Sequence, residues 1–174
     1  RAKSAGVEKM LLIGCDISSS EQSLALAKTY QLFSTAGIHP HDAKTATDSL
    51  ESQLTLLANQ PQVIAIGECG LDYNRDFSPR DIQRSVFRRQ LALAEQLNLP
   101  VYLHERDASH DMINILSEFN VRGILHCFTG DENALKRYLA LGLYIGITGW
   151  VCDERRGQAL QSLIPSIPLN RLLI

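Results

Sequence analysis

The chain has 174 residues, and its 17 Lys and Arg against 19 Asp and Glu give a formal net charge of −2. This balance excludes a broad basic surface for nucleic acid, although it is compatible with a local basic patch. A hydrophobic fraction of 45% excludes a disordered chain and allows one sizeable core.

No apolar run approaches the roughly 18 residues of a membrane span, and no secretory signal pattern stands at the start. The cysteines form no C-x-x-C pair, which disfavours a structural zinc site; they are Cys15, Cys69, Cys127 and Cys152. We expect reduced thiols that pack as small hydrophobic side chains. The sequence thus predicts a cytoplasmic protein with no membrane contact and no obligate protein partner.

Short apolar runs alternate with helical patterns from one end of the chain to the other. We expect strands at residues 9–14, 32–38, 63–67, 101–104, 123–128, 143–147 and 172–174. Helical spacing of apolar residues predicts helices at 18–30, 50–57, 79–98, 112–119, 131–141 and 160–164. For the first of these helices, a serine is the expected N-cap, and for the fifth it is Asp131.

Strict alternation predicts βαβ units and a parallel sheet in a single domain, residues 1–174. A doubly wound sheet and a TIM (β/α)8 barrel both satisfy this pattern. No G-x-G-x-x-G motif follows the first strand, which disfavours a dinucleotide-binding sheet. Polar residues at the ends of many strands favour the TIM barrel, because its sites collect side chains from all the strand ends.

The two ends of the chain suggest that this barrel is incomplete. The chain starts at Arg1, without Met, and residues 171–174 resemble a strand that is cut off before its turn. We therefore expect the first barrel strand to lie before Arg1 and the eighth to be truncated at Ile174. An open barrel of this kind would expose two edge strands, which favour association.

One carboxylate stands out because it follows the buried run at 63–67. We expect that strand to stop at Glu68, where a carboxylate is costly unless it is paired or binds a metal. His104 and His126 follow two later strands, so all three side chains can converge on one face of the barrel. Two imidazoles and a carboxylate suit a divalent metal. The alternative is that each histidine is an ordinary hydrogen-bonded core residue.

Other polar residues follow the same strands. His39 directly follows the second strand, so it should face the same site and orient substrate, bind phosphate or act as an acid. His41 lies farther out, and we expect a surface loop residue there. Arg106 could pair with phosphate through its planar donor fork. Asp107 is expected either to fix an imidazole or to form an Arg–Asp pair or helix cap.

A small basic loop with an aromatic residue beside it follows the sixth strand. Arg155 and Arg156 come shortly after Trp150. A base stacked on this indole would suit single-stranded nucleic acid. A tryptophan in this position is more often simply a core residue, and stacking is the alternative.

Five motifs occur in order along the chain: GIHPH at 37–41, IGECGLDY at 66–73, HERDA at 104–108, HCFTG at 126–130 and GITGWVCDERRG at 146–157. Together they resemble the TatD family of metal-dependent deoxyribonucleases, a branch of the amidohydrolase-like TIM barrels. The resemblance runs essentially from end to end of the chain.

The resemblance implies a hydrolase of phosphodiester bonds, namely a 3′–5′ exonuclease that trims single-stranded DNA, and in some members RNA, with a role in DNA repair and degradation. It implies a divalent metal, Mg²⁺ first with Mn²⁺ or Zn²⁺ as alternatives, held by Glu68, His104 and His126. Glu68, His39 and Arg106 would be catalytic. His39, Arg106 and Trp150 would bind the nucleic acid substrate.

Two features usual in this family are missing from the sequence: an H-x-H pair on the first strand and the aspartate of an E-T-D motif on the last. Their absence leaves an inactive, truncated barrel as one alternative. An amidohydrolase acting on an amide or ester is another. Such enzymes often carry a carbamylated lysine as a bridging ligand, and here Glu68 occupies that role, which disfavours this alternative.

Overall fold

The computed structural model describes residues 1–154 and 157–174, in which seven strands form one parallel sheet. The strands are β1 (Leu11–Leu12), β2 (Phe33–Ala36), β3 (Val63–Asp72), β4 (Val101–Arg106), β5 (Gly123–Leu125), β6 (Tyr144–Gly146) and β7 (Leu172–Leu173). The helices are α1 (Ile17–Tyr30), α2 (Leu50–Ala58), α3 (Arg80–Leu97), α4 (Ser109–Leu116), α5 (Glu132–Ala140) and α6 (Gln158–Leu163). Short 3₁₀ turns are η1 (Lys3–Ala5), η2 (Pro40–Thr45), η3 (Gly149–Cys152), η4 (Ile164–Ser166) and η5 (Leu169–Arg171).

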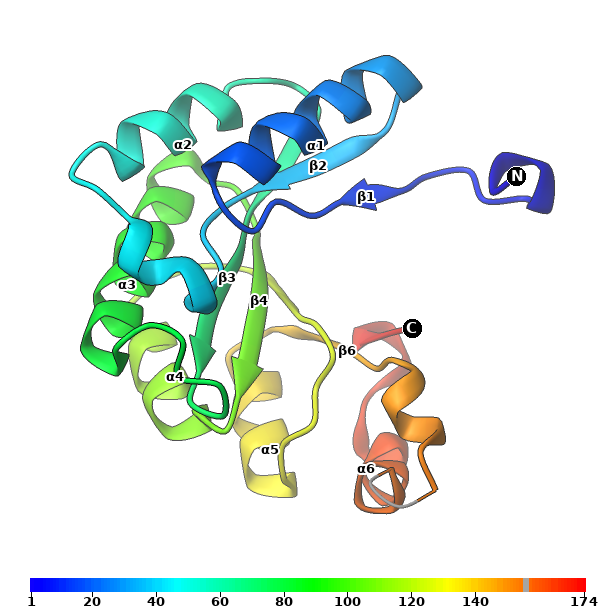
Figure 1. Ribbon diagram of the computed structural model, residues 1–174. Helices are drawn as coiled ribbons and strands as arrows, with labels where there is room; N and C mark the ends of the chain where they lie inside the picture. The colour runs from blue at the N-terminus through cyan, green and yellow to red at the C-terminus, as the bar shows by residue number, and fades with distance from the viewer. Residues whose placement is uncertain (155–156) are drawn as a thin grey trace.

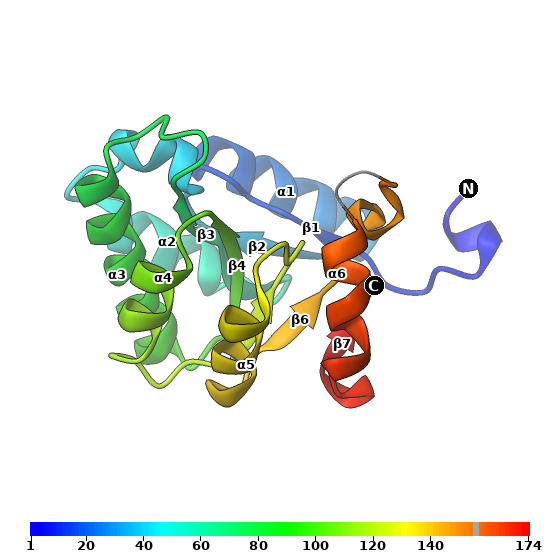
Figure 2. The ribbon, with the colours of Figure 1, turned by 90° about the horizontal axis from the view of Figure 1, so that it is seen from below.

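The order of the strands decides between the two predicted architectures. The strands lie side by side in the order β1-β2-β3-β4-β5-β6-β7, and every neighbouring pair is parallel. A doubly wound sheet would instead reverse its strand order at a switch point. The sheet curls, and helices α1 to α5 lie along its outer side (Figures 1 and 2). The prediction of an incomplete TIM barrel with strictly alternating strands and helices is therefore confirmed.

The starts of two helices follow from capping hydrogen bonds. Asp131 accepts a hydrogen bond from the Ala134 N–H (2.8 Å) and begins α5, as predicted. For α1 the predicted serine cap is wrong, because the Asp16 carboxylate accepts the Ser19 N–H (2.6 Å) and Ser19 Oγ accepts the Asp16 N–H (2.9 Å). This capping box starts the helix at Ile17. No helix in the described residues is both long and apolar enough to cross a membrane.

The longest strand, β3, departs from the prediction at its central carboxylate. We expected the strand to stop at Glu68, but it continues to Asp72. The register with β4 shifts between Gly67 and Cys69, so Glu68 has no partner there. Its N–H instead donates to the Gly14 carbonyl, 2.7 Å away. A β-bulge thus takes Glu68 out of the hydrogen-bonded ladder and changes the direction of its side chain, and the strand continues beyond it.

Close backbone packing beside this bulge requires glycine. A Cβ placed on Gly37 would lie 2.6 Å from the Gly67 backbone, which is closer than side-chain atoms can approach. Gly67 itself has a φ of +141°, a conformation that L side chains rarely adopt. The two glycines therefore let the end of β2 approach β3 directly before the bulge.

The alternation of burial along β4 identifies the side chains that face the barrel interior. Tyr102, His104 and Arg106 are half-buried, whereas the residues between them are buried. Successive side chains of a strand point to opposite faces, so these three share one face. The face carries an aromatic ring, an imidazole and a guanidinium in order toward the C-terminal end of the strand.

Two buried glutamines on α3 bind backbone groups at the ends of β2 and β3. Gln90 accepts the Ile38 N–H (2.7 Å) and donates to the Ile38 carbonyl (3.0 Å). Gln83, on the same face of the helix, accepts the Asp72 N–H (2.8 Å) and donates to the Asp72 carbonyl (3.1 Å). Backbone groups that leave the sheet at these points are thus satisfied inside the core. Ile38 directly precedes His39, so α3 positions a candidate site residue.

We expect Gln90→Leu to lower the free energy of unfolding by roughly 2–6 kcal/mol, because it leaves the Ile38 N–H and carbonyl buried without partners at roughly 1–3 kcal/mol each. Urea denaturation followed by circular dichroism measures the change. Gln96→Leu, on an exposed position of the same helix, is the matched control and should change stability little. Equal losses in both variants would contradict a role for the Gln90–Ile38 hydrogen bonds.

Candidate active site

One oxygen of Glu68 lies among three imidazoles. Its Oε1 is 2.7 Å from His126 Nε2, 3.2 Å from His104 Nδ1 and 3.4 Å from His39 Nε2. Glu68 is only 8% exposed. The bulge on β3 supplies the carboxylate, β4 supplies His104, and the segments after β2 and β5 supply the other two rings. The parallel sheet therefore brings the four predicted side chains into contact although they are far apart in the sequence.

A second carboxylate, Asp72 at the end of β3, lies next to this cluster and is 3% exposed. Its Oδ2 is 2.8 Å from His41 Nε2 and 3.1 Å from His104 Nε2. Its Oδ1 accepts the N–H groups of Asn74 (3.0 Å) and Arg75 (2.8 Å) in a turn. His104 therefore contacts one carboxylate through each ring nitrogen. Sequence reasoning assigned no role to Asp72, although an aspartate followed by a turn was a usable signal.

The carboxylates and imidazoles of this site stabilise one another's charged forms. Burial alone would raise the pKa of the Glu68 carboxyl, but the imidazoles of His104, His126 and His39 hold that pKa far below its ordinary 4.5. Burial alone would lower the pKa of His104, but its two carboxylate neighbours raise that pKa above the ordinary 6.5. The imidazoles therefore stabilise the ionised form of Glu68, and the two carboxylates stabilise the protonated form of His104.

The donor set fits a divalent metal. The ligand atoms of His39, Glu68 and His104 all lie within 4.8 Å of one another. Imidazole nitrogen and carboxylate oxygen are both donors that divalent metals accept, imidazole suiting Zn²⁺ and carboxylate suiting Mg²⁺ and Mn²⁺. His126 also contacts the central carboxylate oxygen, so a fourth donor atom is within reach of the same group.

A cavity of about 480 Å³ opens over these imidazoles. His104, His126, Arg106 and Trp150 are among its lining residues. The guanidinium carbon of Arg106 lies 4.9 Å from the centroid of the Trp150 ring, in cation–π contact. Arg106 and Trp150, two of the three predicted substrate-binding residues, thus share a cavity with the predicted metal ligands His104 and His126, whereas His39 and Glu68 are not among its lining residues.

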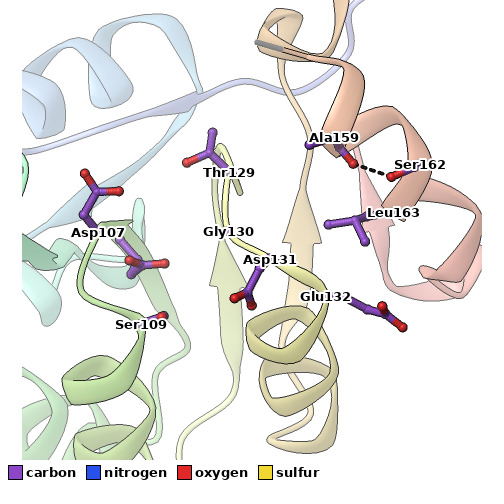
Figure 3. A pocket seen from close by; sticks show the side chains of 10 residues that line it. Asp107, Ser109, Thr129, Gly130, Asp131, Glu132, Ala159, Ser162 and Leu163 are labelled. Atoms are coloured by element: carbon purple, nitrogen blue, oxygen red, sulfur yellow. Dashed lines mark hydrogen bonds between the residues drawn. The ribbon is translucent and has the colours of Figure 1, made fainter.

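A larger hollow of about 550 Å³ lies beside this cavity, between the loops that follow β4 and β5 and helix α6 (Figure 3). It holds no imidazole. Four carboxylates line it, those of Glu105, Asp107, Asp131 and Glu132. Because negative side chains repel phosphate, the smaller cavity with the imidazoles is the better candidate active site.

The predicted surface role of His41 is wrong. Its ring centroid lies 4.3 Å from that of His39, and its Nε2 bonds to the buried Asp72. The turn η2 begins at Pro40 and brings the ring back toward the site. His41 therefore belongs to the imidazole cluster. Within residues 1–154 and 157–174 its carboxylate partner is Asp72 and not Glu68.

The expectations for Asp107 are not met in the described residues. Its Oδ2 accepts a hydrogen bond from Asn74 Nδ2 (2.8 Å) and fixes no imidazole. The partner that contacts two imidazoles is Asp72 instead. The basic loop residues Arg155 and Arg156 lie outside the described residues.

All four cysteines are free, as predicted. The prediction of burial is confirmed for Cys69 and wrong for Cys152, which is exposed; Cys15 and Cys127 are half-buried. Cys15 Sγ lies 3.9 Å from Glu68 Oε2. Burial, and then the charge of Glu68, raises the pKa of Cys15 to about 11, so this residue remains a thiol at neutral pH.

The pKa shifts predict how the stability of the metal-free protein depends on pH. The lowered pKa of Glu68 contributes stability that is complete above pH 4.5 and is lost as the pH falls through the folded-state pKa. The raised pKa of His104 contributes stability that is complete below pH 6.5 and is lost as the pH rises through the folded-state pKa. Stability from this pair should therefore be greatest between pH 4.5 and 6.5. Urea midpoints measured across pH with EDTA present test this, and an unchanged pH profile in Glu68→Gln would contradict it.

Comparison with known proteins agrees with this geometry. The family model described as TatD related DNase matches residues 1–174. The 3′-5′ ssDNA/RNA exonuclease TatD of Enterobacter lignolyticus is 49% identical over 178 residues, which cover 100% of this chain and 68% of the relative. The protein of the same name from Salmonella typhimurium is also 49% identical, with the same coverage.

Two solved structures share the fold closely. A TatD homologue from Escherichia coli aligns with a TM-score of 0.91 at 30% identity, over 99% of this chain and 68% of that one. A hydrolase of the TatD family from Entamoeba histolytica aligns with a TM-score of 0.86 at 28% identity, over 98% of this chain and 60% of that one. Sequence and fold lead to the same conclusion: this chain belongs to the TatD family of DNase-related proteins.

Proposed function

We propose that the protein hydrolyses phosphodiester bonds of nucleic acid as a metal-dependent 3′–5′ exonuclease on single-stranded DNA, with RNA as a second substrate. The observation that carries the proposal is the ionised Glu68 held among three imidazoles, two of which, His104 and His126, line a cavity. The relatives named as 3′-5′ ssDNA/RNA exonucleases support the choice of substrate and polarity.

In this proposal Glu68, His104 and His126 hold the metal, Mg²⁺ first, with Mn²⁺ or Zn²⁺ as alternatives. A bound divalent metal supplies Lewis-acid activation for phosphodiester hydrolysis. Of the three histidines near Glu68, His39 has the longest contact with its Oε1, 3.4 Å. Its Nδ1 accepts the His41 N–H (3.2 Å), so the proton of the neutral ring sits on Nε2, the nitrogen that faces the carboxylate.

The same hydrogen bond gives His39 a different function. The Nε2–H of this ring lies beside Glu68, where it can donate a hydrogen bond to a phosphate oxygen or a proton to a leaving group. His39 is 8% exposed, so its ring is well protected from bulk water. We therefore assign it to substrate binding and proton transfer, and not to metal ligation.

Arg106 is proposed to bind the scissile phosphate. In residues 1–154 and 157–174 its guanidinium has a cation–π contact with Trp150 and no carboxylate partner. A stacked guanidinium keeps its N–H edge free, and that edge matches two phosphate oxygens. Trp150 then serves the substrate by holding Arg106 in place, because the guanidinium already lies over the ring that a base would use.

We expect Glu68→Gln to reduce hydrolysis of single-stranded DNA by more than 100-fold, since loss of an outer partner of a metal ligand alone costs roughly 10–100-fold. The assay follows release of mononucleotide from DNA labelled at its 3′ end, with Mg²⁺, Mn²⁺ and Zn²⁺ in separate reactions. DNA labelled at its 5′ end reports polarity, and EDTA should abolish turnover. Glu118→Gln, which removes an exposed carboxylate paired with Arg88, is the control. Equal rates for Glu68→Gln and the wild type would overturn the proposed function.

We expect Arg106→Ala to lower kcat/KM by roughly 10- to 100-fold, because a hydrogen bond to a charged group contributes roughly 1.5–3 kcal/mol. Arg106→Lys keeps the charge without the fork and should fall between Arg106→Ala and the wild type. Arg88→Ala, on the exposed side of α3, is the matched control. An Arg106→Ala variant with unchanged kcat/KM would remove Arg106 from the proposed site.

A further inference from the structure

Asp72 is hydrogen-bonded through both of its carboxylate oxygens, and none of these contacts in residues 1–154 and 157–174 is with Glu68. Its Oδ2 faces His41 Nε2 at 2.8 Å and His104 Nε2 at 3.1 Å. Its Oδ1 accepts two backbone N–H groups from the turn that follows β3. These contacts occupy both oxygens of a carboxylate that is 3% exposed.

The backbone of Asp72 is fixed as firmly as its side chain. Gln83 accepts the Asp72 N–H (2.8 Å) and donates to the Asp72 carbonyl (3.1 Å). The same Gln83 amide group also donates to the Ser78 carbonyl (2.8 Å), which ties the following loop to α3. Asp72 is therefore held from the helix, the strand and the turn, and its Oδ2 has a defined position.

The two contacts of His104 differ in quality. The contact between Nε2 and Asp72 Oδ2 is an aligned hydrogen bond at 3.1 Å. Nδ1 approaches Glu68 Oε1 at 3.2 Å, in an ion-pair contact with an oxygen that already bonds to His126 Nε2 at 2.7 Å. A neutral imidazole carries one proton, and a carboxylate can only accept. The proton of neutral His104 therefore belongs on Nε2, and Nδ1 is left with its lone pair directed toward Glu68.

We propose that Asp72 is a positioning residue that fixes the Nε2–H tautomer of His104 and so presents Nδ1 as its metal-binding nitrogen. This inference rests on the metal site of the proposed function and adds the identity of the ligating atom. A carboxylate that accepts the second N–H of a ligating histidine orients the ring and increases its basicity. Asp72 would contribute to metal affinity through His104, without ligating the metal itself.

The first experiment uses the unmodified chain without metal. Nitrogen-15 NMR of the histidine rings, recorded at a pH at which His104 is neutral, distinguishes a protonated Nε2 from a protonated Nδ1. We expect the Nε2–H tautomer for His104. A protonated Nδ1 in the neutral ring would overturn the inference, and this result requires no variant to fold.

The second experiment exchanges the acceptor for a donor in Asp72→Asn. The asparagine Oδ1 can still accept the two turn N–H groups, so its NH₂ group faces His41 and His104. His104 Nε2 must then accept, which moves its proton to Nδ1. We expect Mn²⁺ binding, followed by the EPR signal of the free ion, to weaken about 10- to 100-fold.

Asp76→Asn is the matched control, because it removes a carboxylate from the same loop where the partner is the exposed Arg80. It should bind Mn²⁺ as the wild type does. Unchanged Mn²⁺ affinity and an unchanged His104 tautomer in Asp72→Asn would overturn the role of Asp72. Wild-type protein that binds Mn²⁺ through the predicted tautomer but does not cleave DNA would refute the proposed function and leave this inference standing.

Discussion

The buried carboxylate of Glu68 is the constraint on which the rest of this structure depends. An isolated carboxylate in an apolar barrel would be protonated or would destabilise the fold. Here the imidazoles of His126, His104 and His39 contact one of its oxygens, and the pKa of Glu68 falls in spite of burial. The bulge in β3 directs this carboxylate at the imidazoles, and the close packing of the Gly37 backbone against Gly67 lies directly beside that bulge.

Both the parallel sheet and helix α3 position the side chains of the site. Parallel strands deliver side chains from distant parts of the sequence to one end of the barrel, which is how His104 and His126 meet at one carboxylate. The strands alone do not fix the ends of β2 and β3. Gln90 and Gln83 on α3 do so by binding the backbone of the residues at those ends. The precision of the site therefore depends on a helix that contributes no side chain to it.

The parts that sequence could predict are those with a local signal. Apolar runs located the seven strands found in residues 1–154 and 157–174, and a polar residue after a run located Glu68, His104 and His126. The bulge was missed, because a residue that leaves a ladder looks like the end of a strand when only the apolar run is read. The Gln90–Ile38 hydrogen bonds were missed for a different reason. They join residues 52 apart in the sequence, and nothing near Gln90 distinguishes it from an exposed helix residue.

The imidazoles also show why residue type alone could not assign roles within the site. His39 and His104 lie at similar distances from the same Glu68 oxygen. Their second contacts differ: His39 Nδ1 accepts a backbone N–H, whereas His104 Nε2 faces a carboxylate. A backbone N–H can only donate and a carboxylate can only accept, so the two rings carry opposite hydrogen-bonding character toward Glu68. In their neutral forms one ring would direct a proton at the central carboxylate and the other a lone pair, and this difference is the basis for proposing one as a proton donor and the other as a metal ligand.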